Sequence, residues 1–304
     1  MDSSNSDEHR MLKDTIVGLL SANPSPTEVW TQLCEFGMVG LTLPESLGGA
    51  DLGLAELMLI AQELGRGGVD TPFMASEVLA LPLVVAYAQN PILRAVLPDV
   101  LTGKTVFALA DVDGEKVSCA TRNGQGYHLT GSKQFVMQGA VASHFVVSAM
   151  LENESALFII PTDTDRLTLD AYAHACGDAA VDVCFADVDL PKDALLVRGT
   201  AAVDALARAQ ARGVLCTAAA MVAAMETLLD QTTDYLRTRR QFGVALSSFQ
   251  VLQHSAVDMY VELELARAML DYGQTMMQAD AVSRGLALDA VKVKINEAAR
   301  IVGE

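Results

Sequence analysis

The chain has 304 residues, of which 51% are hydrophobic and only 19% are charged. This length allows two or three structural units, and the apolar excess predicts large helix–helix or subunit contacts. The formal net charge of −17 excludes nucleic acid and anionic membranes as main partners.

Cysteine and histidine usage argues against cross-links and metal sites. The five cysteines are widely spaced without a CxxC motif, which favours reduced cytosolic thiols; they are Cys34, Cys119, Cys176, Cys184 and Cys216. The five histidines lack metal-ligand spacing, so we expect no metal. The N-terminal residues lack the pattern of a secretory signal, and the Ala-rich run 214–225 is too short for a membrane span, so we expect a cytoplasmic protein.

The first third of the chain has helical periodicity. Leu12, Ile16 and Leu19 fall on one face of a first helix, and Ser25-Pro26-Thr27-Glu28 has the composition of a second helix start. Further helices are predicted at 54–64, 76–88 and 92–101.

Short apolar and alternating runs replace this pattern after Thr105. Strands are predicted at 106–110, 127–130, 145–147, 157–160, 167–169 and 181–185, with a turn at Gly131-Ser132. Several short strands at this spacing indicate an antiparallel sandwich or barrel.

Helical periodicity returns after Pro191. Long helices are predicted at 201–237, 248–277 and 286–302, the second with apolar residues beyond one face, as in a subunit interface. The fold class is therefore mainly α with a middle β-domain. The predicted domains are 1–103 (helical), 104–192 (β) and 193–304 (helical, with the last helix still running where the sequence stops).

Three arginines stand together at the end of the first long C-terminal helix. They are Arg237, Arg239 and Arg240, followed by Gln241 and Phe242. One interpretation is a helix C-terminal cap, since cations favour that end of the helix dipole. The other is an anion site, because guanidinium groups bind phosphate oxygens in a bidentate way.

This segment resembles the signature of the acyl-CoA dehydrogenase family. The residues 235–243 (YLRTRRQFG), 248–254 (SFQVLQH) and Asp258-Met259 match "R-x-Q-F-G…F-Q…Q…D-M" in order. The stretch 38–49 is similar to the family's "GLxGLxxPExxGG", and 127–142 is similar to "YxLxGxKxxVxxGxxA". Within the family, the resemblance favours the bacterial branch that includes the small subunits of pimeloyl-CoA-type dehydrogenases.

The resemblance implies an N-terminal helical domain, a β-barrel and a C-terminal helical bundle that bind FAD partly across a subunit interface. It implies that Arg239 and Gln241 contact the pyrophosphate of a neighbouring subunit's FAD, with Phe242 beside it and Gln250 nearby. Phe135, Val136 and Met137 occupy the stretch that covers one face of the flavin, although ordinary core packing is the alternative for Phe135 and Met137. Thr or Ser is common where Met137 stands, so a hydroxyl contact to the flavin is not expected here.

Two departures from the family pattern concern the chemistry. The "TEPxxGSD" loop is not recognisable in the corresponding residues 108–114. A carboxylate base is needed to remove the α-proton, but the usual Glu lies further along than Glu304, and the alternative position near Arg212-Gly213 has no Glu. Glu226 is predicted to be a surface residue, so the catalytic base is unidentified.

Three hypotheses follow. In the first, the chain is a FAD-dependent acyl-CoA dehydrogenase that forms trans-2-enoyl-CoA as part of an oligomer, and its C-terminal part lies beyond this sequence. In the second, it is a flavin-poor partner subunit of a heteromeric dehydrogenase. In the third, it is a structural relative without redox activity. In the first two, the resemblance implies an acyl-CoA substrate and an electron-transfer flavoprotein as electron acceptor.

Overall fold

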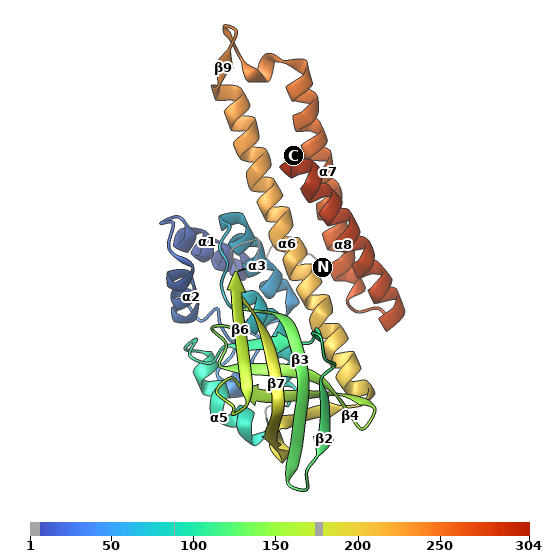
Figure 1. The fold of residues 1–304 in the computed structure, drawn as a ribbon. Helices are drawn as coiled ribbons and strands as arrows, with labels where there is room; N and C mark the ends of the chain where they lie inside the picture. The colour runs from blue at the N-terminus through green and yellow to red at the C-terminus, as the bar shows by residue number, and fades with distance from the viewer. Residues whose placement is uncertain (1–6, 88, 174–178) are drawn as a thin grey trace. The chain divides into compact units, whose positions relative to one another are not determined.

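A computed structural model of the protein describes residues 7–87, 89–173 and 179–304 (Figure 1). The chain forms two compact units, which are described separately. The helical unit comprises residues 1–23, 54–69 and 213–304, and the β unit comprises residues 24–53 and 70–212. The predicted order of helices, strands and helices is confirmed. The division at residues 103 and 192 stays a prediction, because each compact unit combines separate stretches of the chain.

In its described residues the helical unit contains five α-helices, one of which it shares with the β unit. They are α1 (Asp7–Leu20), α3 (Leu54–Gly67), the part of α6 (Thr200–Thr238) from residue 213, α7 (Gln250–Met276) and α8 (Ala281–Gly303). α1 packs on α3, where its Ile16 and Leu19 are buried as predicted, and α7 packs on α8. A Cβ on Gly65 of α3 would lie 2.4 Å from the Ala220 carbonyl oxygen of α6, so only glycine allows this close helix approach.

The β unit begins with short helices. They are α2 (Pro26–Glu35), η2 (Glu45–Leu47), the π-helix η3 (Met74–Ala80), α4 (Leu81–Val85) and α5 (Pro91–Val100). Ser25 and Glu28 form the capping box of α2, in which each side chain bonds the other residue's backbone N–H. The helix predicted at 76–88 is in part a π-helix, a form that often marks functional sites.

An eight-stranded sheet follows, and the β unit also includes η4 (Lys192–Ala194) and α6 up to residue 212. Its strands are β1 (Phe107–Ala110), β2 (Cys119–Arg122), β3 (Gly126–Met137), β4 (His144–Leu151), β5 (Glu154–Pro161), β6 (Leu167–Ala173), β7 (Ala179–Pro191) and β8 (Leu195–Arg198). The order is β6-β7-β3-β2-β4-β5-β8, with β1 paired to β4. Pairing is antiparallel except for β1 and β2, which each run parallel to β4.

Several predictions about the strands were wrong. Gly131-Ser132 is not a turn: β3 continues through both residues, and Gly131 (φ 128°) marks a shift in its pairing with β7. β2 was missed because only Ala120 of its four residues is buried, which leaves no alternating pattern. β8 was missed because it follows Pro191, where helix was expected.

The helix α6 contains an 18-residue window that is long and apolar enough to cross a bilayer, and half of that window is buried inside the protein. A buried core helix has the same properties. None of Cys34, Cys119, Cys184 and Cys216 forms a disulfide, and Cys176 lies outside the described residues.

Candidate functional site

The residues that the sequence predicted to contact FAD lie on both compact units. Arg239, Gln241, Phe242 and Gln250 belong to the helical unit, and Phe135–Met137 belong to the β unit. The geometry of each group is therefore described by itself.

In the helical unit, a small hairpin follows the end of α6. Its strands are β9 (Arg240–Gln241) and β10 (Val244–Ala245), and Phe242-Gly243 forms the turn. Both turn residues have positive φ, 53° and 83°, as a type I′ hairpin turn requires. This turn usually has Asn or Gly first, because a bulky side chain strains the left-handed conformation. Phe242 therefore occupies a position that folding alone would not select.

Phe242 is 92% exposed as a residue, and its ring and the Phe249 ring stand edge to face at 6.3 Å between centroids. Burial of a large apolar side chain normally stabilises the folded protein by about 2 kcal/mol. An exposed phenyl ring does not contribute this stabilisation. A strained backbone and an exposed ring at one residue together indicate that Phe242 is kept for a ligand or partner.

The three arginines of this segment have different roles. Arg237, in the last turn of α6, pairs with Asp234 at 3.3 Å, so the helix-cap interpretation suits it. Arg240 donates a hydrogen bond to the Gly243 carbonyl at 3.0 Å and closes the hairpin. The Arg239 side chain is exposed and has no hydrogen bond or ion pair with any residue that the structure describes. Its guanidinium is therefore available for an anion.

The two glutamines of the predicted site are also exposed. Gln241 lies on β9 next to the turn, and Gln250 is the first residue of α7. Because the short connection η5 (Leu246–Ser248) joins hairpin and helix, both glutamines belong to the same end of the helical unit as Arg239. Amide groups there could add hydrogen bonds to phosphate oxygens.

In the β unit, Phe135–Met137 close the strand β3. Phe135 has a φ of 56° and is 41% exposed, while the Val136 side chain is buried in the sheet core and Met137 is half-buried. Of the nine non-glycine residues with positive φ in the described parts of the chain, only Phe135 and Phe242 are aromatic. The family resemblance pointed to Phe135 at the flavin ring and to Phe242 beside the pyrophosphate, although a sequence motif carries no direct information on backbone strain.

The loop after β1 has its own polar network. The Lys133 side chain is buried, and its ammonium group bonds Asp113 Oδ1 at 2.7 Å, Ser148 Oγ at 3.0 Å and the Asp111 carbonyl at 3.4 Å. Burial lowers the pKa of Lys133; burial alone would raise that of Asp113, but the hydrogen bond from Lys133 holds the pKa of Asp113 below its usual range. The Asp111 carboxylate accepts a bond from Gln210 on α6 at 2.8 Å. The residues that replace the family's loop are thus tied to the sheet and to α6.

The prediction that Glu226 is a surface residue is wrong. Its side chain is only 14% exposed and bonds Arg66 of α3 and Arg267 of α7, each at 2.6 Å. Burial alone would raise the pKa of Glu226, but the hydrogen bonds from the two arginines hold it below its usual range. A carboxylate held in this way is a poor proton acceptor. Its partners were missed because they lie 160 and 41 residues away in the sequence.

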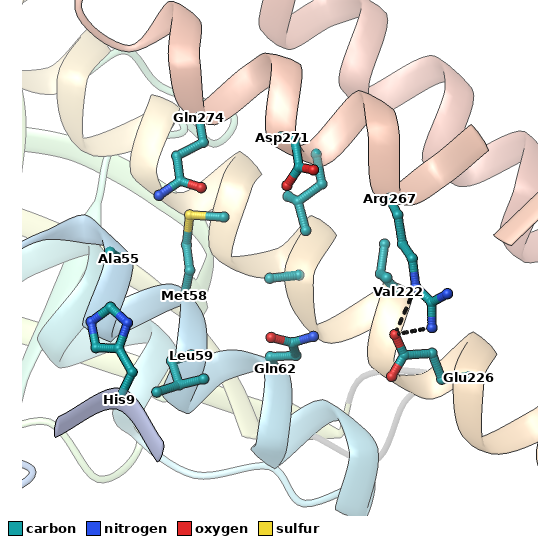
Figure 2. A pocket seen from close by; sticks show the side chains of 12 residues that line it. His9, Ala55, Met58, Leu59, Gln62, Val222, Glu226, Arg267, Asp271 and Gln274 are labelled. Carbon is teal, nitrogen blue, oxygen red and sulfur yellow. Dashed lines mark hydrogen bonds and ion pairs between the residues drawn. The ribbon is translucent and has the colours of Figure 1, made fainter. Parts of the chain in front are cut away.

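A pocket of about 290 Å³ adjoins this ion pair within the helical unit (Figure 2). Met58, Ala219, Val222 and Leu270 form apolar parts of its lining. The side chains of Gln62, Asp271 and Gln274 supply polar groups, and Figure 2 shows the Arg267–Glu226 pair at one end of the pocket.

Glu77 is the other carboxylate that sequence reasoning missed. It lies in the π-helix η3, fully buried, and accepts bonds from Gly40 N–H at 2.7 Å and Ser76 Oγ at 3.2 Å. Burial raises the pKa of Glu77 to about 7. The sequence feature that could have identified Glu77 is that it is the single Glu in the apolar run 74–85. No group of His, Cys, Asp and Glu residues in the described ranges could hold a metal ion.

The observed residues fit FAD in chemical type. An unpaired guanidinium at Arg239 suits a pyrophosphate, and the exposed rings of Phe135 and Phe242 suit contact with flat aromatic groups. The Val136 side chain is not available for such contact, because it packs in the sheet core.

Two family models match the chain. "Acyl-CoA dehydrogenase, N-terminal domain" matches residues 6–104, and "Acyl-CoA dehydrogenase, C-terminal domain" matches residues 205–304. Among similar curated proteins is acyl-CoA dehydrogenase FadE27 of Mycobacterium tuberculosis, 27% identical over 84% of this chain and 68% of that protein.

Two solved structures share the fold. The ChsE4-ChsE5 complex from Mycobacterium tuberculosis contains a chain that matches all of this one and 88% of its own length, with a TM-score of 0.84 and 22% identity. A glutaryl-CoA dehydrogenase from Mycobacterium smegmatis in complex with FADH2 matches 99% of this chain and 84% of its own, with a TM-score of 0.84 and 20% identity.

Proposed function

Since the chain belongs to the acyl-CoA dehydrogenase family, we propose that it is a subunit of an oligomer that oxidises an acyl-CoA thioester to the trans-2-enoyl-CoA. Acyl-CoA dehydrogenases are FAD-dependent oxidoreductases that act on CH–CH groups. When bound, FAD would supply the acceptor for the β-hydrogen as hydride, and the protein would need a base to remove the α-proton.

One observation carries the proposal: the hairpin at residues 239–245 combines an unpaired arginine with an exposed, strained phenylalanine. In this role Arg239 binds the pyrophosphate, with hydrogen bonds added by Gln241 and Gln250. Phe242 packs beside the cofactor and keeps water from that contact. Phe135 and Met137 of the β unit cover one face of the flavin ring.

The base is the open part of this proposal. The helix α6 has no carboxylate between Asp204 and Glu226, and Glu226 is held by two arginines. In the loop after β1, Asp113 is paired with Lys133, and Asp111 is bonded by Gln210. These partnered carboxylates favour a second candidate function, that of a partner subunit that leaves proton abstraction, and in part flavin binding, to another chain. The structural relative ChsE4-ChsE5 is itself a complex of two differently named proteins, which agrees with such an assembly.

Exposed apolar residues on α7 support assembly. They are Val251, Val257, Tyr260, Val261, Leu265 and Tyr272. An apolar helix face of this extent is typical of subunit interfaces. We also propose an electron-transfer flavoprotein as electron acceptor, a cytoplasmic location and, within the family, the pimeloyl-CoA-type small-subunit branch.

The test is a dye-reduction assay with a panel of straight-chain, branched, dicarboxylic and steroid side-chain acyl-CoAs, run on this chain alone and on the oligomer purified from its native host. We expect acyl-CoA-dependent dye reduction by the oligomer. If this chain alone is as active, the partner-subunit function is wrong and the base lies within these residues. A flavin-containing oligomer that no acyl-CoA reduces would contradict both candidate functions.

A further inference from the structure

A bulge interrupts the pairing of β3 with β7 next to Phe135. Lys133 pairs with Val183 and Val136 pairs with Val181, so Gln134 and Phe135 of β3 face the single residue Asp182 of β7. Two residues opposite one define a β-bulge, which bends the strand and leaves one residue outside the regular ladder. Phe135 is the residue of this bulge that has positive φ.

The Asp182 side chain supplies the hydrogen bond that the ladder does not. Its Oδ1 accepts the Phe135 N–H at 2.9 Å, and the same oxygen accepts the Tyr172 hydroxyl of β6, also at 2.9 Å. A hydrogen bond from a backbone amide to a carboxylate is stronger than one to a neutral carbonyl. Tyr172 in turn restricts the carboxylate to the orientation that this amide needs.

The other side of the bulge is fixed independently. Lys133, the last residue before it, is anchored by its buried ammonium group to Asp113 and Ser148. The Gln134 N–H bonds the Val112 carbonyl at 3.0 Å. Asp182 therefore acts directly on the Phe135 backbone, while Lys133 and Gln134 are bonded to other residues.

We propose that Asp182 is a positioning residue, whose carboxylate holds Phe135 in its strained conformation with the ring turned outward to contact the flavin. This inference rests on the proposed function, since it assigns the purpose of the exposed ring to the cofactor. Bulges commonly redirect a side chain next to an active site. Without the carboxylate, the Phe135 amide loses its bond to Asp182 Oδ1, and β3 can relax toward regular pairing that turns the ring elsewhere.

The test compares Asp182→Ala with Asp170→Ala in the assembled protein. Asp170 is the matched control, because it pairs with Asp182 across β6 and β7 and is also exposed. Asp182→Asn is the conservative variant, since its amide oxygen can still accept the Phe135 N–H. Hydrogen exchange of the peptide around Phe135, measured without flavin, reports the hydrogen bond from the Phe135 amide to Asp182. FAD titration with visible circular dichroism reports the contact of the Phe135 ring with the flavin.

We expect Asp182→Ala to speed exchange at Phe135 and to weaken FAD binding, each by about tenfold, and to change the flavin's circular dichroism. Asp170→Ala should leave all three unchanged, and Asp182→Asn should restore most of each. Unchanged exchange in Asp182→Ala would overturn the inference.

A second comparison separates this inference from the proposed function. If Asp182→Ala speeds exchange but leaves FAD binding unchanged, while Arg239→Ala weakens FAD binding, the positioning role is wrong and the proposed function stands. If neither variant affects FAD, the proposed function fails and the positioning role for flavin fails with it.

Discussion

The two compact units each keep a phenylalanine in a strained, exposed conformation, but they stabilise it by different means. In the helical unit, Phe242 is followed by Gly243 in a two-residue turn, and the ring of Phe249 lies against it. In the β unit, Phe135 lies in a bulge, and the carboxylate of Asp182 accepts its amide hydrogen. The first arrangement is local in sequence and the second is not, since 47 residues separate Phe135 and Asp182.

The units also differ in how each binds a carboxylate removed from solvent, the partly buried Glu226 and the fully buried Glu77. Glu226 of the helical unit has two arginine partners, so its pKa is lowered in spite of burial. Among the described residues, Glu77 of the β unit accepts hydrogen bonds from an N–H and a hydroxyl but pairs with no cation, so burial raises its pKa to about 7. Burial therefore does not decide by itself whether a carboxylate can accept a proton near neutral pH, because the partners determine the direction.

The largest expected effect concerns Glu77→Gln. A rise in pKa from 4.5 to about 7 corresponds to about 3 kcal/mol. Since the folded-state value is raised, this contribution to stability is complete below pH 4.5 and is lost as pH rises through about 7. Urea unfolding from pH 4 to 8 should therefore show less loss of stability with rising pH in Glu77→Gln than in the wild type.

Glu226→Gln is the contrasting variant. Because the pKa of Glu226 is lowered, its contribution is present above 4.5 and is lost as pH falls through the folded-state value. This variant should be destabilised at neutral pH, with the difference from the wild type shrinking in acid. If both variants shift the pH profile in the same direction, the comparison of the two carboxylates is wrong.

Arg239→Ala should have the next largest effect. A charge-assisted contact to phosphate contributes roughly 1.5–3 kcal/mol, so FAD affinity should fall about ten- to a hundredfold. Arg237→Ala is the control, because Arg237 already pairs with Asp234 and should change affinity little. Equal losses in the two variants, measured by flavin fluorescence titration, would mean that the segment attracts the cofactor by charge alone.

The smallest expected effect is the change in the protein's stability when Phe242 is replaced by glycine. Glycine adopts positive φ without strain, so Phe242→Gly should stabilise the protein by about 1 kcal/mol while lowering FAD affinity. Phe135→Gly should also relieve strain, but the amide bond to Asp182 remains. Thermal unfolding and FAD titration of the two variants measure both changes. A loss of stability in Phe242→Gly would indicate that the ring packs within the protein rather than on a ligand.

The sequence predicted the helices and several strands because these depend on local patterns. Ser25 and Glu28 start α2 as expected, and the long helix α6 has nearly the bounds that its periodicity indicated. The wrong turn at Gly131-Ser132 has a physical cause. Gly and Ser commonly mark turns, but Gly131 here gives β3 the positive φ of an irregular pairing, which depends on β7 more than 50 residues later.

The candidate site was predictable only in part for the same reason. The arginines and Phe242 stand together in the sequence, so the hairpin was found. The partners of Glu226, Lys133 and Phe135 are distant in sequence, so nothing in the local pattern indicated which carboxylates are held by cations and which hold a backbone amide. Burial and pairing of these groups arise from tertiary structure, which composition and periodicity do not encode residue by residue.

The most direct test of the central claim is the visible absorbance spectrum of the oligomer purified from its native host, before and after anaerobic addition of acyl-CoA. The account predicts the absorption of oxidised flavin in the purified protein and its loss when a suitable acyl-CoA is added. It also predicts that an oligomer carrying Arg239→Ala retains less flavin. A colourless wild-type oligomer that binds no added FAD would contradict the claim that this chain is a subunit of a FAD-dependent dehydrogenase.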